Sequence, residues 1–313
     1  MKTKRDPADT IHIAMAFDLA YLSPFMVMMT SVLIHNKQHP VHLHVITSGL
    51  NTRQQKQLEN FIRRSGGEIS FYEISPELLT GLTPPKDTHI TVATFYRLFF
   101  PQLVPGTIEK LLYLDPDMII LGDLSELYNT SLNGFAVGAI PEINQPWVRS
   151  DLGFTSKDQY FNAGVMLIDV KEWIRQEITE RSVKYARNNQ ESIVWADQDA
   201  LNGVLFGNYF KLDSKYNVLH FDVPQALSRI SYEQFIADKV ILHFTNIKYK
   251  PWSKTTKTPL RFVYLHYLSR SPRWTERYRL EVLYYSVRFR RGLKKQLTNW
   301  LPALIPFRYS RNS

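Results

Sequence analysis

The chain has 313 residues, of which 44% are hydrophobic and 21% are charged, a composition typical of a folded protein with a sizeable core. Its net charge of +9 is uneven, because residues 270–313 hold 11 of the 38 basic residues and two of the 29 acidic ones. The rest of the chain is neutral overall, which argues against a uniformly basic nucleic-acid-binding protein. The absence of cysteine excludes disulfide bonds, zinc–thiolate sites and thiol catalysis, and it fits a cytoplasmic protein.

Polar residues interrupt the apolar residues near the start of the chain. The continuous apolar run that a signal peptide requires is broken by Asp6, Asp9, His12, Asp18 and Pro24. No stretch of the sequence reaches the roughly 20 apolar residues that span a bilayer. We therefore expect the first segment to form a strand and a helix, and the protein not to be exported.

Strand and helix patterns alternate along the first part of the chain. Short apolar runs predict strands at residues 11–16, 41–46 and 69–74, and longer segments predict helices at residues 22–35 and 52–65. Asn51 or Thr52 is a suitable N-cap for the second helix, and Gly66-Gly67 is a natural stop after it. This strand–helix–strand order with short connections predicts a parallel, doubly wound α/β sheet.

The same pattern continues after a loop at Pro84-Pro85. It predicts helices at residues 91–100 and 171–189, and strands at 110–114, 135–140, 165–168 and 240–243. Asp123 and Glu126 have the spacing of a capping box that would begin a further helix. We expect one domain over residues 1–268 and a basic, aromatic tail over residues 269–313.

The sequence lacks the glycine-rich loops that bind phosphates in many nucleotide-binding proteins. Neither G-x-G-x-x-G nor G-x-x-x-x-G-K-[ST] occurs, which argues against a dinucleotide dehydrogenase or a P-loop NTPase. If this chain binds a nucleotide diphosphate, a group other than a glycine-rich loop must bind the phosphates. A divalent metal ion held by carboxylates could do so.

Asp115 and Asp117 are the first candidates for such a site, because they directly follow a predicted strand. Residues i and i+2 of an extended backbone face the same side, so both carboxylates could reach one Mg²⁺ or Mn²⁺. His243 ends an apolar run and could add a nitrogen ligand that suits Mn²⁺. The alternatives are a solvated turn for the two acids and a hydrogen-bonded core residue for the histidine. Lys250 could neutralise a leaving phosphate or could be an ordinary surface charge.

Six motifs in order resemble the retaining glycosyltransferases of family 8, a GT-A fold group that includes bacterial lipooligosaccharide galactosyltransferases and glycogenin. They are Ala16-Phe17-Asp18, Thr94-Phe95-Tyr96-Arg97-Leu98, Leu112-Tyr113-Leu114-Asp115-Pro116-Asp117, Tyr160-Phe161-Asn162-Ala163-Gly164-Val165, Asp197-Gln198-Asp199-Ala200-Leu201-Asn202, and His243-Phe244 before Lys250-Pro251-Trp252. The resemblance covers residues 11–252 and implies a GT-A, Rossmann-like fold. That fold has a mixed, mainly parallel sheet flanked by helices, followed here by a basic C-terminal tail.

The resemblance also implies a role for each matching residue. Metal ligands would be Asp115, Asp117 and His243; donor contacts would come from Asp18, Tyr21, Arg97, Asp115, Asn162, Ala163, Gly164, Asn246 and Lys250; Asp197 and Gln198 would act beside the transferred sugar. The chain departs from the family pattern in three places. Leu19-Ala20 replaces a common Asp-Asn, Asn246 stands near the place of a glycine, and one extra residue precedes Lys250.

The implied activity is transfer of a hexose, galactose or glucose, from a UDP-sugar to a glycan such as lipopolysaccharide or a lipid-linked oligosaccharide. Mn²⁺ or Mg²⁺ would be the cofactor. Because the amide of Gln198 is a poor nucleophile, we favour attack from the face that the UDP leaves over a covalent glycosyl–enzyme intermediate. The alternative is a catalytically silent scaffold that binds a nucleotide sugar or a membrane.

Basic and aromatic residues alternate with leucine and valine at helical spacings along residues 270–313. This pattern is typical of a helix that lies on anionic lipid, and it predicts peripheral attachment to the inner face of the cytoplasmic membrane. A solvated end and a nucleic-acid-binding tail are the alternatives. We expect no nucleic-acid partner, because no binding motif accompanies the charge.

Overall fold

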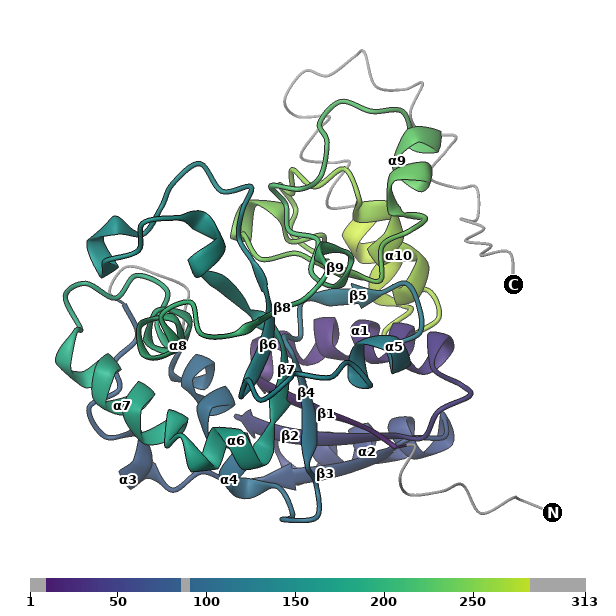
Figure 1. Ribbon diagram of the computed structural model, residues 1–313. Helices are drawn as coiled ribbons and strands as arrows, with labels where there is room; N and C mark the ends of the chain where they lie inside the picture. Colours follow the sequence, from purple (N-terminus) through teal and green to yellow (C-terminus); the bar gives the residue numbers. More distant parts are fainter. Residues whose placement is uncertain (1–9, 86–90, 282–313) are drawn as a thin grey trace.

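A seven-stranded sheet with the order β3-β2-β1-β4-β7-β6-β8 forms the centre of the protein (Figure 1). The computed structural model describes residues 10–85 and 91–281. The strands of the sheet are β1 (Ile11–Asp18), β2 (Val41–Ser48), β3 (Glu68–Tyr72), β4 (Lys110–Leu114), β6 (Val137–Pro141), β7 (Phe161–Asp169) and β8 (Phe210–Lys211). The strand predictions from the sequence are confirmed, with shifts of a few residues at the ends.

The sheet is mixed and mainly parallel, as the family resemblance implies. β1 is parallel to β2 and β4, and β2 is parallel to β3, whereas β7 is antiparallel to both β4 and β6. The parallel order predicted from the first part of the chain is confirmed for β1 to β4, and the antiparallel strand β7 makes the sheet as a whole mixed. β6 and β8 are parallel again, so antiparallel pairing in the main sheet is confined to the two neighbours of β7, which need no helical crossover.

Helices cover both faces of the sheet (Figure 1). On one face Ile13 of β1 packs in the same apolar cluster as Phe25 of α1 and Leu58 of α2, while on the other Ala14 shares a cluster with Phe95 and Leu201. The α-helices are α1 (Leu22–His35), α2 (Thr52–Arg64), α3 (Pro76–Leu79), α4 (Phe100–Leu103), α5 (Ser125–Tyr128), α6 (Val170–Arg175), α7 (Ile178–Asn188), α8 (Asp197–Leu205), α9 (Arg229–Ile236) and α10 (Arg261–Leu268). The 3₁₀-helices are η2 (Leu19–Tyr21), η3 (Val92–Phe99), η4 (Ser150–Leu152), η5 (Lys157–Gln159), η6 (Ser214–Tyr216) and η7 (Ile247–Tyr249).

Three predictions about helices need correction. The helix expected at residues 171–189 is two helices, α6 and α7, because Glu177 adopts a left-handed backbone with φ 53°. The capping box of Asp123 and Glu126 does not form, since Asp123 Oδ1 accepts from the amide of Ser125 at 2.7 Å and the short helix begins there. The segment at 91–100 is mainly the 3₁₀-helix η3. By contrast, Asn51 caps α2 as expected.

A small second sheet, which the sequence did not predict, lies beside the main one. It pairs β5 (Met118–Ile120) with β9 (Ile241–His243) in antiparallel register, with Met118 opposite His243. The amide of Phe244 extends the pairing by donating to the carbonyl of Asp117 at 3.0 Å. This pairing brings the end of β9 next to the loop after β4.

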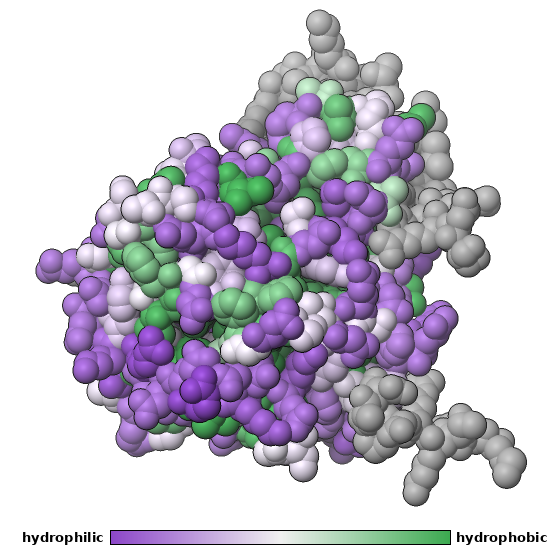
Figure 2. Space-filling model, viewed as in Figure 1, coloured by the Kyte–Doolittle hydropathy of each residue, from purple (hydrophilic) through white to green (hydrophobic). Residues whose placement is uncertain are grey.

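Residues 269–281, at the start of the predicted tail, contact the main body. Ser23 Oγ donates to Glu276 Oε2 at 2.6 Å, and Arg261 donates to the carbonyl of Leu280 at 3.0 Å. The remainder of the tail, from residue 282, lies outside the described residues. Within the described part of the chain no helix has the length and apolarity needed to cross a membrane. On the face shown in Figure 2 hydrophilic residues predominate, and hydrophobic ones form small separate patches.

Candidate active site

The site lies where β1 and β4 end and β7 begins, at one edge of the sheet. Because β7 runs antiparallel to β4, its first residues lie beside the last residues of β4. The amide of Asp115 donates to the carbonyl of Gly164 at 2.9 Å, which joins the loop after β4 directly to β7. The carboxyl ends of parallel strands are where ligands bind in open α/β sheets.

Asp115, Asp117 and His243 come together at this edge. Their candidate ligand atoms all lie within 4.8 Å of one another. His243 Nε2 is 3.1 Å from Asp117 Oδ1 and 3.7 Å from Asp115 Oδ2. The spatial cluster that the sequence analysis expected is therefore confirmed, although the three residues come from two distant parts of the chain.

The hydrogen bonds of His243 set the direction of its lone pair. Its Nδ1 lies 2.9 Å from Asn217 Oδ1, an atom that can only accept, so Nδ1 carries the proton and donates. In a neutral ring Nε2 then presents its lone pair to the two carboxylates. Metal-binding histidines commonly donate their other ring N–H to an oxygen in this way.

The cluster fits a divalent cation. Asp117 Oδ1 is buried and accepts no hydrogen bond, and an imidazole lone pair beside carboxylate oxygens is unfavourable without a positive charge between them. Gly164 leaves space for the cluster, because a Cβ there would lie 2.2 Å from His243 Cε1 and 2.8 Å from Asp115 Oδ2. Two carboxylates and one imidazole are a donor set that suits Mn²⁺ or a related cation.

Two cations of the protein balance the negative charge of the site. Lys250, which is 5% exposed, forms an ion pair with Asp117 Oδ2. Burial acts to raise the pKa of Asp117, but the ammonium of Lys250 outweighs it and lowers the pKa. Asp117 is therefore ionised at neutral pH.

Arg97 holds the other carboxylates in place. Its guanidinium is 2.9 Å from Asp115 Oδ1 and 2.6 Å from Asp197 Oδ2, and it donates to the carbonyl of Ala163 at 2.6 Å. Burial acts to lower the pKa of Arg97, but Asp115 and Asp197 outweigh it and raise the pKa. With these contacts Arg97 positions the loop of Asp115 and the start of β7.

A chain of amide side chains leads from the metal cluster to Gln198. Asn217 Nδ2 donates to Asn162 Oδ1 at 3.0 Å, and Asn162 Nδ2 donates to Gln198 Oε1 at 3.1 Å and to Glu142 Oε1 at 2.8 Å. Gln198 Oε1 also accepts from the amide of Ala163 at 3.1 Å. The amide oxygen of Gln198 is thus held by the side chain of Asn162 and by the backbone of Ala163.

The backbone before α8 is strained. Ala196, which is fully buried, has φ 48° and ψ −116°, a conformation that L-residues rarely adopt and that often marks functional sites. It places Asp197 and Gln198 at the first turn of α8. Asp197 is 1% exposed and accepts from Thr94 Oγ1 as well as pairing with Arg97.

The remaining predicted residues lie around the same edge. Asp18 caps η2 by accepting from the amide of Ala20 at 3.0 Å, and the ring of Tyr21 meets that of Trp252 edge to face at 6.0 Å. Burial is the main cause that raises the pKa of Tyr21. Asn246 caps η7 by accepting from the amide of Lys248 at 2.9 Å.

The model of glycosyl transferase family 8 matches residues 12–256 of the chain. The chain belongs to this family. General stress protein A of Bacillus subtilis is 30% identical over 271 residues, which cover 83% of this chain and 94% of that protein. A lipopolysaccharide 1,2-glucosyltransferase of Escherichia coli is 28% identical, and the match covers 85% of this chain and 79% of that protein. The fold is that of the galactosyltransferase LgtC, which was solved with donor and acceptor sugar analogues. The two structures match with a TM-score of 0.71 and 24% sequence identity, over 84% of this chain and 96% of that one.

Family membership identifies the chain as a glycosyltransferase with a GT-A fold. Members with an Asp-rich metal site typically depend on a divalent cation, and Asp115, Asp117 and His243 form a candidate for such a site in this chain. The cluster lies within the part of the chain that matches the family.

Two residues of this glycosyltransferase site were missed by the sequence analysis. Glu142 touches both Asn162 and Gln198, and it follows β6 just as Asp115 follows β4, so the same signal of an acid after a strand could have found it. Asn217 orients His243, but nothing in the local sequence indicates this, since the contact depends on tertiary packing.

Replacing Asn217 should weaken metal binding. In Asn217→Ala, His243 loses the acceptor that fixes its tautomer, so the affinity for Mn²⁺ should fall about 10–100-fold, as for other groups that orient metal ligands. Asn217→Asp keeps an acceptor oxygen and should stay near the affinity of the unmodified chain. Mn²⁺ titration calorimetry measures both; equal affinities for the alanine variant and the unmodified chain would contradict the role.

Glu142 should make stability depend on pH. Burial, with smaller contributions from Asp199 and Asp222, raises its pKa from 4.5 to about 7. Between these values the unfolded chain loses a proton that the folded chain keeps, so stability falls as pH rises. Glu142→Gln should remove this loss. The free energy of unfolding of this variant, compared with that of the unmodified chain, should therefore rise by about 3 kcal/mol between pH 4.5 and a pH above 7.

Urea unfolding at several pH values measures this difference. The matched control is Glu191→Gln, at an exposed position, which should shift stability equally at every pH. A difference between Glu142→Gln and the unmodified chain that does not grow with pH would contradict the assignment.

Proposed function

We propose that this glycosyltransferase moves a hexose, galactose or glucose, from a UDP-sugar to a cell-surface glycan such as lipopolysaccharide or a lipid-linked oligosaccharide, with retention at the anomeric carbon. The observation that carries the proposal is the buried cluster of Asp115, Asp117 and His243, with Lys250 beside it. The names of the lipopolysaccharide glucosyltransferase and the galactosyltransferase it resembles support the hexose and the acceptor class.

Mn²⁺ is the proposed ion, with Mg²⁺ as the alternative, because the cluster contains an imidazole nitrogen. When bound, the ion would supply positive charge that stabilises the UDP leaving group. Lys250 adds a second positive charge from the protein. Its Nζ lies 5.6 Å from the ring centres of both Tyr21 and Trp252, in surroundings that exclude water and strengthen its field.

The donor would lie along the edge formed by β1, β7 and η7. Asp18 and Tyr21 at the end of β1 are proposed to hold the uracil, and Asn246 and Lys250 the diphosphate. Arg97, Asn162, Ala163 and Gly164 are proposed to shape the position of the sugar, where Gly164 allows close approach of the backbone. The burial of Arg97 and its contacts with two carboxylates support a positioning role for it.

Gln198, with Asp197 before it, is the proposed residue beside the anomeric carbon. Its amide is held by Asn162 and the backbone of Ala163, so it can present a fixed dipole to a developing positive charge. An amide cannot easily form a covalent sugar adduct. We therefore propose same-face attack, in which the acceptor hydroxyl gives its proton to the leaving phosphate.

The acceptor is proposed to enter a hollow next to Gln198. Glu142, Asn144, Asn217, Phe221 and Asp222 are among the residues that line it. Carboxylate and amide groups can bind sugar hydroxyls, and the ring of Phe221 offers an apolar face. The hollow adjoins the amide chain from His243 to Gln198, which supports its place beside the reaction centre.

The decisive test measures UDP release from UDP-galactose, UDP-glucose and UDP-N-acetylglucosamine, with Mn²⁺ or with EDTA. Release should require the metal and favour a hexose donor. Asp117→Asn should lower turnover by about 10²–10³-fold, because it removes a charged ligand. Asp238→Asn, at a side chain that is 75% exposed, is the matched control. Binding of donors without UDP release would instead support the silent scaffold.

The same reactions distinguish the two retaining mechanisms. Intact-mass spectrometry during turnover should show no hexose attached to the protein if attack occurs on the leaving-group face. A hexose adduct on Glu142, the carboxylate that touches Gln198, would show double displacement instead.

We propose that the basic tail attaches the enzyme to anionic lipid on the inner face of the cytoplasmic membrane. Removing residues 282–313 keeps the contacts of Glu276 and Leu280 with the body and removes seven basic residues. The shortened chain should lose most of its binding to phosphatidylglycerol vesicles and keep its UDP release. Replacing Arg288, Arg290, Arg291, Lys294 and Lys295 by glutamine is the matched test of charge. Undiminished binding by either variant would contradict the proposal.

A further inference from the structure

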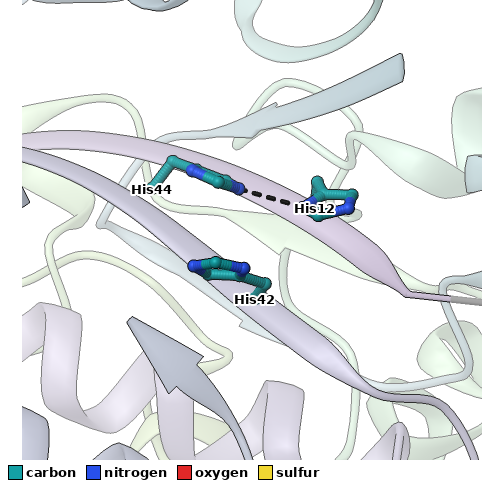
Figure 3. A group of neighbouring side chains, drawn as sticks. All are labelled: His12, His42 and His44. Carbon is teal, nitrogen blue, oxygen red and sulfur yellow. Dashed lines mark hydrogen bonds between the residues drawn. The ribbon is translucent and has the colours of Figure 1, made fainter. Parts of the chain in front are cut away.

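Three histidines lie together at the opposite end of β1 and β2 from the donor site. His12 of β1 pairs with His42 of β2, and His44 follows two residues later on the same face. His12 Nδ1 is 3.0 Å from His44 Nε2, and the rings of His42 and His44 stack with centres 4.4 Å apart (Figure 3). One ring nitrogen of each lies within 4.8 Å of the others.

Each of the two rings on β2 has an oxygen partner on the neighbouring strand β3. His44 Nδ1 is 2.8 Å from the hydroxyl of Tyr72, and His42 Nε2 is 2.9 Å from Ser70 Oγ. When these nitrogens donate to the hydroxyls, the opposite nitrogens, His44 Nε2 and His42 Nδ1, carry the lone pairs. This is the arrangement by which proteins orient metal-binding imidazoles.

The rings are poorly suited to carry positive charge. Burial and the neighbouring His42 lower the pKa of His12 to about 4, and burial together with both other histidines lowers that of His44 to about 3. Neutral imidazole is the form that binds metals. His44 is fully buried, while His12 and His42 are partly exposed, so an ion could enter from that side.

We propose that His12, His42 and His44 form a second divalent-metal site, which takes zinc-like transition metals in preference to Mn²⁺. Three imidazoles suit Zn²⁺, Ni²⁺ or Cu²⁺, whereas Mn²⁺ favours sites with more oxygen ligands. His12 Nδ1 donates to the lone pair of His44 Nε2 at 3.0 Å, a separation close to that of two ligands on one ion. An ion that replaces this hydrogen bond requires the proton of His12 to move to its Nε2. Binding by His42 requires its ring to turn out of the stack with His44.

The carboxylate of Glu68 is placed to complete the site. Its Oε2 is 3.7 Å from His42 Nδ1, and Glu68 pairs with His42 in the sheet. An ion there would join β1, β2 and β3 at their amino-terminal ends. Six residue steps along β1, about 20 Å of extended strand, lead from His12 to Asp18, so this site is distinct from the catalytic cluster.

The test uses the full chain with Asp115→Asn and Asp117→Asn, which weaken the catalytic cluster, and Zn²⁺ as the probe. Titration calorimetry should find one tight zinc site, and a large excess of Mn²⁺ should not displace the zinc. His44→Gln and His12→Gln in this background should each lower the zinc affinity by about tenfold or more. His39→Gln, at a histidine outside the cluster, should not.

Two further measurements make the outcome decisive. Zn²⁺ should raise the midpoint of thermal unfolding of the background chain but not of His44→Gln, and circular dichroism without metal checks that each variant folds. Co²⁺ added to the background chain should give the visible absorption of a tetrahedral nitrogen site. Unchanged zinc affinity in folded His44→Gln, or no tight site in the background chain, would show a hydrogen-bonded histidine cluster only.

Discussion

The pairing of β5 with β9 is the constraint on which the active site depends. Met118 lies opposite His243 in this two-stranded sheet, and the amide of Phe244 donates to the carbonyl of Asp117. Backbone hydrogen bonds therefore fix an imidazole beside two carboxylates that belong to a distant loop. Because the backbone already places the three side chains side by side, their candidate ligand atoms lie close enough together to hold one cation.

A glycine and an arginine also determine where the side chains of the cluster lie. Gly164 lets His243 and Asp115 approach β7 at distances that a Cβ would forbid, and Arg97 links Asp115 to Asp197 across the same loop. Buried charges are costly to desolvate, so these ion pairs add little net stability. Their contribution is the fixed arrangement of charge, which a glycosyl transfer can use because the groups do not have to reorganise.

The two ends of β1 carry different chemistry on one rigid element. Asp18 at the carboxyl end adjoins the proposed donor site, and His12 at the amino end belongs to the histidine cluster with His42 and His44. One cluster offers two carboxylates and one imidazole, and the other offers three imidazoles. Because these donor sets differ, the two clusters would favour different metals. A strand held between two parallel neighbours keeps both sets of ligands in place.

The sequence alone determined the order of the elements and indicated the candidate metal ligands. Apolar runs predicted the strands, the N-cap at Asn51 was correct, and Asp115, Asp117 and His243 were recognised from their place after strands and from ordered family motifs. These are local signals, readable from neighbouring residues. The sequence could not fix the break at Glu177 or the failed cap at Asp123, because tertiary packing and local side-chain competition decide them.

Only the tertiary structure decided which distant residues touch. The antiparallel insertion of β7, the β5–β9 pairing and the contact of Asn217 with His243 all depend on long-range packing. The same holds for Glu142, whose raised pKa comes from burial next to Asn162 and Gln198. Such contacts follow from how whole elements pack, since hydrogen-bond direction and burial are properties of three-dimensional neighbours and leave no periodic pattern in the chain.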